Sequence, residues 1–143
     1  MQKNRILKEA LSAAEKGAYR TAFEKWLPLA KKGNTVAQYN IAVMYLRGDG
    51  LQRSNKLALH WLMKASKKGH ALSQFTLGRM YYEGMGVLKN YKKSLKWYKK
   101  AAVNGHKKAQ NNLGLMYFHG VGVKKDRSKA YKWFLESEKN PRI

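Results

Sequence analysis

The chain has 143 residues, 44% of them hydrophobic, which is enough for one domain with a buried core and excludes extensive disorder. Thirty Lys and Arg against eight Asp and Glu give a formal net charge of +22. That charge favours an anionic partner, such as nucleic acid, an anionic membrane surface or an acidic protein. A genome biased toward lysine codons is the alternative explanation. With no cysteine, disulfides and thiolate metal sites are excluded.

The first 36 residues predict a helix pair, over 4–15 and 19–31. Pro28 lies in the second helix and is expected to bend or shorten it. Residues 1–14 hold charged side chains and no unbroken apolar stretch, so we expect no signal peptide and a cytoplasmic location. No apolar run reaches 18 residues, so no membrane insertion is expected.

Identical residues then recur at a spacing of 36 in three successive segments, which predicts a repeat architecture. The columns are Gln38, Gln74 and Gln110; Met44, Met80 and Met116; Tyr45, Tyr81 and Tyr117; Gly48, Gly84 and Gly120; Gly50, Gly86 and Gly122; Trp61, Trp97 and Trp133; and Gly33, Gly69 and Gly105 at the joints.

Each repeat predicts two helices, because apolar residues recur at helical spacing and glycine pairs interrupt them. The first helices are expected over 37–47, 73–83 and 109–119, and the second helices over 55–67, 91–103 and 127–139. A helix pair of this size cannot bury its apolar face alone, so neighbouring pairs must stack.

These columns resemble Sel1-like repeats. The segments that carry the resemblance are AQYNIAVMYLRGDG (37–50), SQFTLGRMYYEGMGV (73–87) and AQNNLGLMYFHGVGV (109–123), with KLALHWLMKASKKG (56–69) and KSLKWYKKAAVNG (93–105) as second halves. Ala42 stands where the family usually has glycine, and Leu51 where it usually has valine.

The resemblance implies an all-α fold, a right-handed α/α superhelical solenoid related to tetratricopeptide arrays. We therefore expect a single repeat domain over 1–143. It would comprise an N-terminal half-repeat cap (1–36), three repeats (37–72, 73–108 and 109–139) and a tail (140–143). The resemblance also implies a non-enzymatic adaptor that binds a protein or peptide partner, as in bacterial relatives.

The residues point to no catalytic, cofactor or metal site. His60, His70, His106 and His119 lack a metal-binding spacing. His70 and His106 share one repeat position just after the joint glycine, so a structural or solvent-facing role is expected. Acidic residues are too scattered to form a carboxylate pair for acid–base catalysis.

A partner-binding surface is predicted on the side of each first helix opposite its buried stripe, which lines the concave surface in related arrays. We name it the first-helix face. Its predicted members are Tyr39, Val43, Leu46, Arg47, Phe75, Arg79, Tyr82, Glu83, Asn111, Leu115, Phe118 and His119. Exposed aromatic and aliphatic side chains favour recognition of a partner. Packing of these side chains on neighbouring repeats is the alternative.

A second candidate surface, the lysine ridge, is predicted on the convex, outer side of the second helices. Its members are Arg53, Lys56, Lys64, Lys89, Lys92, Lys93, Lys96, Lys99, Lys100, Lys125 and Lys132. An anionic partner would relieve the repulsion between these charges. Lysines outnumber arginines 23 to 7, so contact with nucleic acid would be nonspecific. An ordinary solvated face is the alternative.

The sequence thus predicts a protein or peptide partner, possible nonspecific contact with nucleic acid, and no inserted membrane segment. A homodimer through the C-terminal end is a further prediction. The apolar side of the last helix, near Tyr131 and Phe134, has no predicted helix after it.

Overall fold

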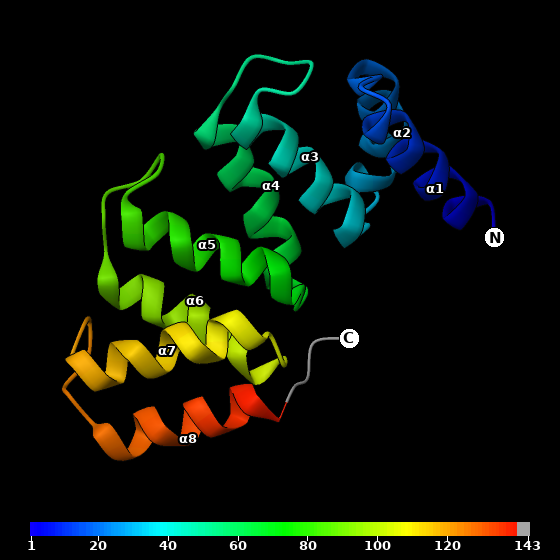
Figure 1. Ribbon diagram of the computed structural model, residues 1–143. Helices are drawn as coiled ribbons and strands as arrows, with labels where there is room; N and C mark the ends of the chain where they lie inside the picture. Colours follow the sequence, from blue (N-terminus) through cyan, green and yellow to red (C-terminus); the bar gives the residue numbers. More distant parts are fainter. Residues whose placement is uncertain (140–143) are drawn as a thin grey trace. The chain divides into compact units, whose positions relative to one another are not determined.

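The computed structural model describes residues 1–139, and in that range it contains eight α-helices and no strand (Figure 1). The helices are α1 (Gln2–Glu15), α2 (Tyr19–Lys31), α3 (Thr35–Arg47), α4 (Asn55–Lys67), α5 (Ala71–Glu83), α6 (Tyr91–Val103), α7 (Lys107–His119) and α8 (Arg127–Glu138). The all-helical fold class is confirmed. The predicted tail 140–143 lies outside the described residues.

The chain divides into two compact units, an N-terminal unit over Met1–Lys68 and a C-terminal unit from Gly69 onward. In each unit the helices pack as consecutive pairs, with α1 on α2 and α3 on α4 in the first unit, and α5 on α6 and α7 on α8 in the second (Figure 1). The sequence had predicted one repeat domain without this subdivision.

The first helices end at equivalent positions of the three repeats. The first helices α3, α5 and α7 each end at a glycine with positive φ, namely Gly48, Gly84 and Gly120. Residues with a side chain rarely adopt this left-handed conformation, which explains the glycine column. Helix α2 continues to Lys31, three residues past Pro28, so the proline does not end the helix there.

The first helices begin two residues earlier than the repeat pattern predicts. Asn34, His70 and His106 are the N-caps of α3, α5 and α7, and each side chain accepts a hydrogen bond from a backbone N–H of the first turn. Asn is a common capping residue and His is not, so propensity alone signals only the first of these caps.

Each unit has its own core. In the N-terminal unit Trp26, Ala30, Ile41 and Met44 are buried among other apolar side chains of α1 to α3. In the C-terminal unit the buried cluster comes from α6, α7 and α8; its members are Tyr98, Ala101, Ala102, Ala109, Leu113, Met116, Tyr117 and Ala130.

Two members of the glutamine column join consecutive helix pairs through buried hydrogen bonds, one in each unit. Gln38 donates its side-chain N–H to the Ala30 carbonyl of the preceding helix at 3.0 Å, and Gln110 donates to the Ala102 carbonyl, also at 3.0 Å. The carbonyls in the last turn of a helix lack partners within that helix. Gln38 and Gln110 therefore supply partners for such carbonyls where one helix pair of a unit meets the next.

Two helical glycines allow aromatic rings to approach closely. A Cβ atom added to Gly78 would lie 2.5 Å from the Tyr98 ring, and one added to Gly114 would lie 2.5 Å from the Phe134 ring. In the first repeat, Ala42 stands at the glycine position and Leu62 stands 36 residues before Tyr98. Both side chains are fully buried. The first repeat thus has a methyl group at the glycine position and a leucine, which is smaller than tyrosine, at the ring position.

Candidate partner-binding surfaces

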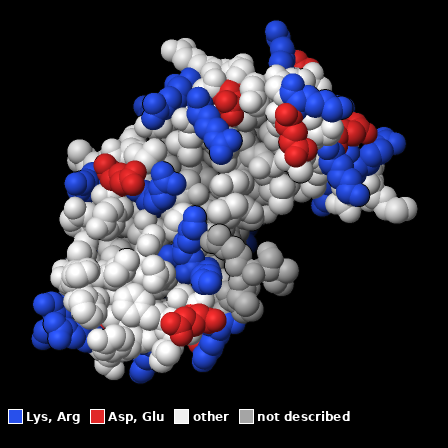
Figure 2. Space-filling model, viewed as in Figure 1, with Lys and Arg blue, Asp and Glu red and all other residues white. Residues whose placement is uncertain are grey.

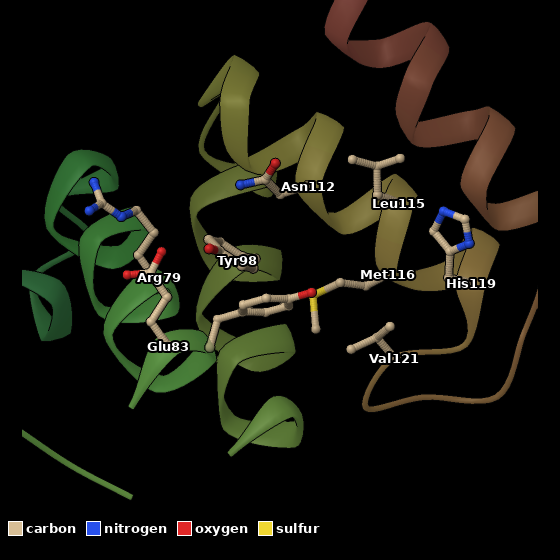
Figure 3. A pocket seen from close by; sticks show the side chains of 9 residues that line it. Arg79, Glu83, Tyr98, Asn112, Leu115, Met116, His119 and Val121 are labelled. Atoms are coloured by element: carbon tan, nitrogen blue, oxygen red, sulfur yellow. The ribbon is translucent and has the colours of Figure 1, made fainter. Parts of the chain in front are cut away.

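The C-terminal unit contains a groove of about 410 Å³ between its two first helices, α5 and α7. Arg79 and Glu83 come from α5 on one side and Leu115 and His119 from α7 on the other, with Tyr98 of α6 between them (Figure 3). We call this the α5–α7 groove. Its lining is completed by Tyr82, Asn112, Met116 and Val121.

The floor of the groove is buried and largely apolar, with one hydroxyl group. Tyr98 is 3% exposed and Met116 is also 3% exposed, so both are fixed by the core beneath. Burial raises the pKa of Tyr98 to about 12, although a hydrogen bond with the Asn112 side chain opposes that shift. The Tyr98 hydroxyl therefore stays protonated at neutral pH and presents a polar group at the base of the groove.

The walls combine accessible apolar surface with polar groups. Tyr82 is 37% exposed and Leu115 is 42% exposed, although Tyr82 also packs on Tyr91 with ring centroids 5.0 Å apart. Arg79, Glu83 and His119 are exposed at the rim (Figure 3). Apolar surface with a few polar groups at the rim is typical of binding sites for small ligands and peptide side chains.

Five members of the predicted first-helix face line this groove, and the other seven lie elsewhere. The five are Arg79, Tyr82, Glu83, Leu115 and His119. Asn111 is exposed on α7, where it lines a separate hollow with Lys107 and Lys108. The four members on α3 belong to the N-terminal unit; Tyr39, Val43 and Leu46 are half-buried there and Arg47 is exposed.

The remaining two aromatic members have intramolecular partners. Phe75 stacks on the ring of the capping residue His106, with centroids 4.5 Å apart, and its ring also lies 5.6 Å from that of Tyr98. Phe118 is half-buried and lies under the Arg127 guanidinium, 5.2 Å from its centroid. For these two rings, packing against the rest of the unit accounts for much of their surface.

All eleven members of the lysine ridge are exposed, and several lie over aromatic rings. The ammonium groups of Lys96 and Lys100 lie 5.8 Å and 5.7 Å from the centroid of the Trp97 ring. Lys93 covers Tyr81 at 5.5 Å, and Lys64 covers Trp61 at 5.9 Å. Such contacts contribute roughly 0.5–1 kcal/mol each at exposed sites and restrict where the charge lies.

The acidic residues do not neutralise the ridge. Within the described residues, three of the ion pairs lie on α1 and α2, where Figure 2 shows blue and red groups side by side. The fourth joins Lys139, the C-cap of α8, to Glu136 at 3.4 Å. No ridge residue forms an ion pair in residues 1–139, so its charge is left to solvent or to a partner.

Residues 1–139 contain no group of three or more His, Cys, Asp or Glu side chains that could hold a metal ion. Across the same residues, no helix has the length and apolar character needed to cross a membrane.

Paired helices of one size, equivalent caps and equivalent glycine ends define a helical-repeat protein with surface grooves. The family model described as Sel1 repeat matches residues 35–70, 71–106 and 107–139. Each match begins two residues before the start expected from the sequence, and the last match ends at the expected residue 139. The chain therefore belongs to the Sel1 repeat family. Proteins of this family generally mediate protein–protein interactions and are generally non-enzymatic scaffolds.

Solved structures support this assignment. A Sel1 repeat protein from Oxalobacter formigenes superposes with a TM-score of 0.90 at 29% identity, over 94% of this chain and 56% of that one. A protective antigen present in uropathogenic Escherichia coli strains, described as displaying an SLR fold, superposes with a TM-score of 0.81 at 34% identity. The match covers 84% of this chain and 26% of that one. The chain thus spans about half and about a quarter of these two proteins.

Helicobacter pylori cysteine rich protein B shares the fold, with a TM-score of 0.69 at 20% identity over 85% of this chain and 90% of that one. No curated protein sequence matches the chain.

Sequence reasoning missed the groove residues that do not lie on the expected sides of the first helices. Four such residues line the groove: Tyr98 from a second helix, Val121 from a loop, Met116 from the buried side of α7, and Asn112, one position beyond the predicted Asn111. A helical projection of α5 and α7 cannot identify a floor that another helix supplies. Gly78 is the signal that was available, because a helical glycine often marks the close approach of a neighbour.

Proposed function

We propose that this chain is a non-enzymatic interaction module that binds a peptide segment of a protein partner in the α5–α7 groove. The observation that carries the proposal is the groove itself, with a buried, largely apolar floor of Tyr98 and Met116 and accessible walls of Tyr82 and Leu115. Its volume of about 410 Å³ lies within the range of ligand-binding pockets. The general role of Sel1 repeats in protein–protein interactions supports the same function.

The groove favours a partner segment with an apolar side chain flanked by polar or acidic groups. An apolar side chain would remove the exposed surfaces of Tyr82 and Leu115 from water. Arg79 and His119 at the rim can donate hydrogen bonds to carbonyl or carboxylate oxygens. The net charge of +22 attracts an acidic segment over a longer range than these contacts.

Selection from a random peptide library on the immobilised protein tests the proposal. A selected peptide, labelled for fluorescence anisotropy, should bind Leu115→Ala about tenfold more weakly than the unaltered protein. The reason is that an anchoring side chain contributes roughly 1 kcal/mol or more to binding. Leu72→Ala is the matched control, because Leu72 is 40% exposed, Leu115 is 42% exposed, and Leu72 does not line the groove.

Equal affinity of the peptide for Leu115→Ala and Leu72→Ala would contradict the assignment of the groove. Failure of the library to yield any binding peptide would contradict a peptide-binding function altogether. Both variants should unfold at nearly the same temperature as the unaltered protein, because neither side chain is buried.

A further inference from the structure

A second hollow lies on the other helices of the C-terminal unit and has a different chemical character. It has a volume of about 510 Å³, and α6, α7 and α8 contribute its lining. Four lysines surround it: Lys99 from α6, Lys129 and Lys132 from α8, and Lys139, the C-cap of α8. Glu136 is the one acidic group of its lining. We call it the α6–α8 hollow.

The charge around this hollow is mostly positive. Its lining holds four lysines and one glutamate, a formal excess of three positive charges. Lys99 and Lys132 have no ion-pair or cation–π partner within residues 1–139. Lysine charges brought together on neighbouring helices repel one another, and an anion placed among them lowers the free energy of the surface.

The hollow also has an aromatic floor, made by Tyr117 and Trp133. Tyr117 is 5% exposed, and the Lys129 ammonium lies 5.5 Å from its ring centroid, so little of that ring is free. Trp133 is half-buried and lines the hollow. Its ring is therefore the one flat apolar surface among the four lysines that a ligand can reach.

A comparison with the preceding repeat shows how this ring comes to be open. Trp97 occupies the equivalent position, and Lys96 and Lys100 cover it. The residue that corresponds to Lys100 is Glu136, which pairs with Lys139. No cation lies over Trp133 among residues 1–139. The last repeat thus retains the basic surroundings and leaves the tryptophan uncovered.

We propose that the α6–α8 hollow binds single-stranded nucleic acid, with phosphates on Lys99, Lys129 and Lys132 and a base against Trp133. Proteins that bind single strands combine a positively charged groove with aromatic side chains on which bases stack. A duplex keeps its bases stacked inside and offers none to Trp133. Lysine rather than arginine at these positions favours binding without sequence preference. This site is separate from the α5–α7 groove and goes beyond the proposed function.

Fluorescence anisotropy with a labelled oligothymidylate and the intact chain tests the proposal. The affinity should fall as salt rises from about 50 to 200 mM. The variant Lys99→Gln/Lys132→Gln removes two contacts and should bind roughly 25-fold more weakly at 0.1 M salt, because each contact contributes about 0.7 to the logarithmic salt slope. Lys3→Gln/Lys31→Gln, with the same change of net charge on α1 and α2, should bind nearly as well as the unaltered protein.

Unlabelled competitors identify the ligand class. A single strand should compete better than inorganic polyphosphate at equal phosphate concentration, and Trp133→Leu should abolish that preference, because base stacking contributes about 1–3 kcal/mol per base. Equal competition by polyphosphate, or stronger competition by anionic vesicles or a poly-glutamate peptide, would overturn the assignment. So would equal affinities of the two double variants. Leu115→Ala should bind the oligonucleotide normally, which separates this result from the test of the groove.

Discussion

His106 begins α7 by accepting a hydrogen bond at its Nδ1 atom from the Ala109 backbone N–H, at 3.1 Å. His70 caps α5 in the same way, with Ser73 N–H 3.3 Å from its Nδ1. Only the neutral ring has a lone pair to accept these bonds. Burial lowers the pKa of both histidines, and the Lys108 charge adds to the effect at His106. The folded state therefore favours their neutral forms.

The free energy of unfolding should consequently decrease as the pH falls. Because the folded-state pKa lies below the ordinary value of 6.5, the unfolded chain binds protons first as the pH falls. The contribution of the two caps is fully present above pH 6.5 and is lost as the pH falls through the folded-state pKa. His106→Ala should cost about 0.5–2 kcal/mol at pH 7 through loss of the cap.

Asparagine at both positions should remove this pH dependence, because Asn34 already caps α3 in the same chain. Urea unfolding at pH 7 and pH 5 should show a smaller loss of stability for His70→Asn/His106→Asn than for the unaltered protein. His60→Asn, which changes a histidine in the middle of α4, serves as the control. An identical loss in the double variant and in the unaltered protein would rule out the caps as the source.

At the scale of the helix pair, Gly78 and Tyr98 set the distance between α5 and α6. Gly78→Ala would place a methyl group 2.5 Å from the Tyr98 ring and should cost about 1–3 kcal/mol, although alanine is the better helix former by about 1 kcal/mol. Adding Tyr98→Leu, which copies the Ala42 and Leu62 pair of the first repeat, should recover part of that loss. Chemical denaturation of the two single variants and the double variant measures the coupling. Strictly additive losses would show that the ring and the glycine do not constrain each other.

The helices could be predicted well because their period is repeated three times, and the second helices begin at the predicted residues Asn55, Tyr91 and Arg127. The starts of the first helices could not be predicted, because His70 and His106 cap through ring nitrogens rather than through a common capping side chain. The groove was predicted only in part, because some of its lining depends on contacts between helices. Periodicity indicates which side of a helix is exposed, but the close approach of Tyr98 depends on tertiary packing.

For the whole molecule, the predicted self-association through the C-terminal end stays a prediction. Tyr131 and Leu135 on α8 are 55% and 58% exposed. If the chain dimerises through them, light scattering at high protein concentration should show a larger species, and Tyr131→Lys should reduce it. Because each copy carries a charge of +22, added salt should strengthen the dimer, whereas it weakens binding to nucleic acid. A single monomeric species at all concentrations and salt levels would contradict the prediction.

We propose above all that the α5–α7 groove recognises a protein. The most direct measurement is quantitative affinity capture from cells that express the gene naturally, with nuclease treatment and with three baits: the unaltered chain, Tyr82→Ala/Leu115→Ala, and Leu72→Ala. We predict that one set of proteins survives nuclease treatment, is recovered equally on the unaltered chain and Leu72→Ala, and is lost from the groove variant. Recovery of the same proteins on the groove variant, or loss of all partners after nuclease treatment, would contradict the claim.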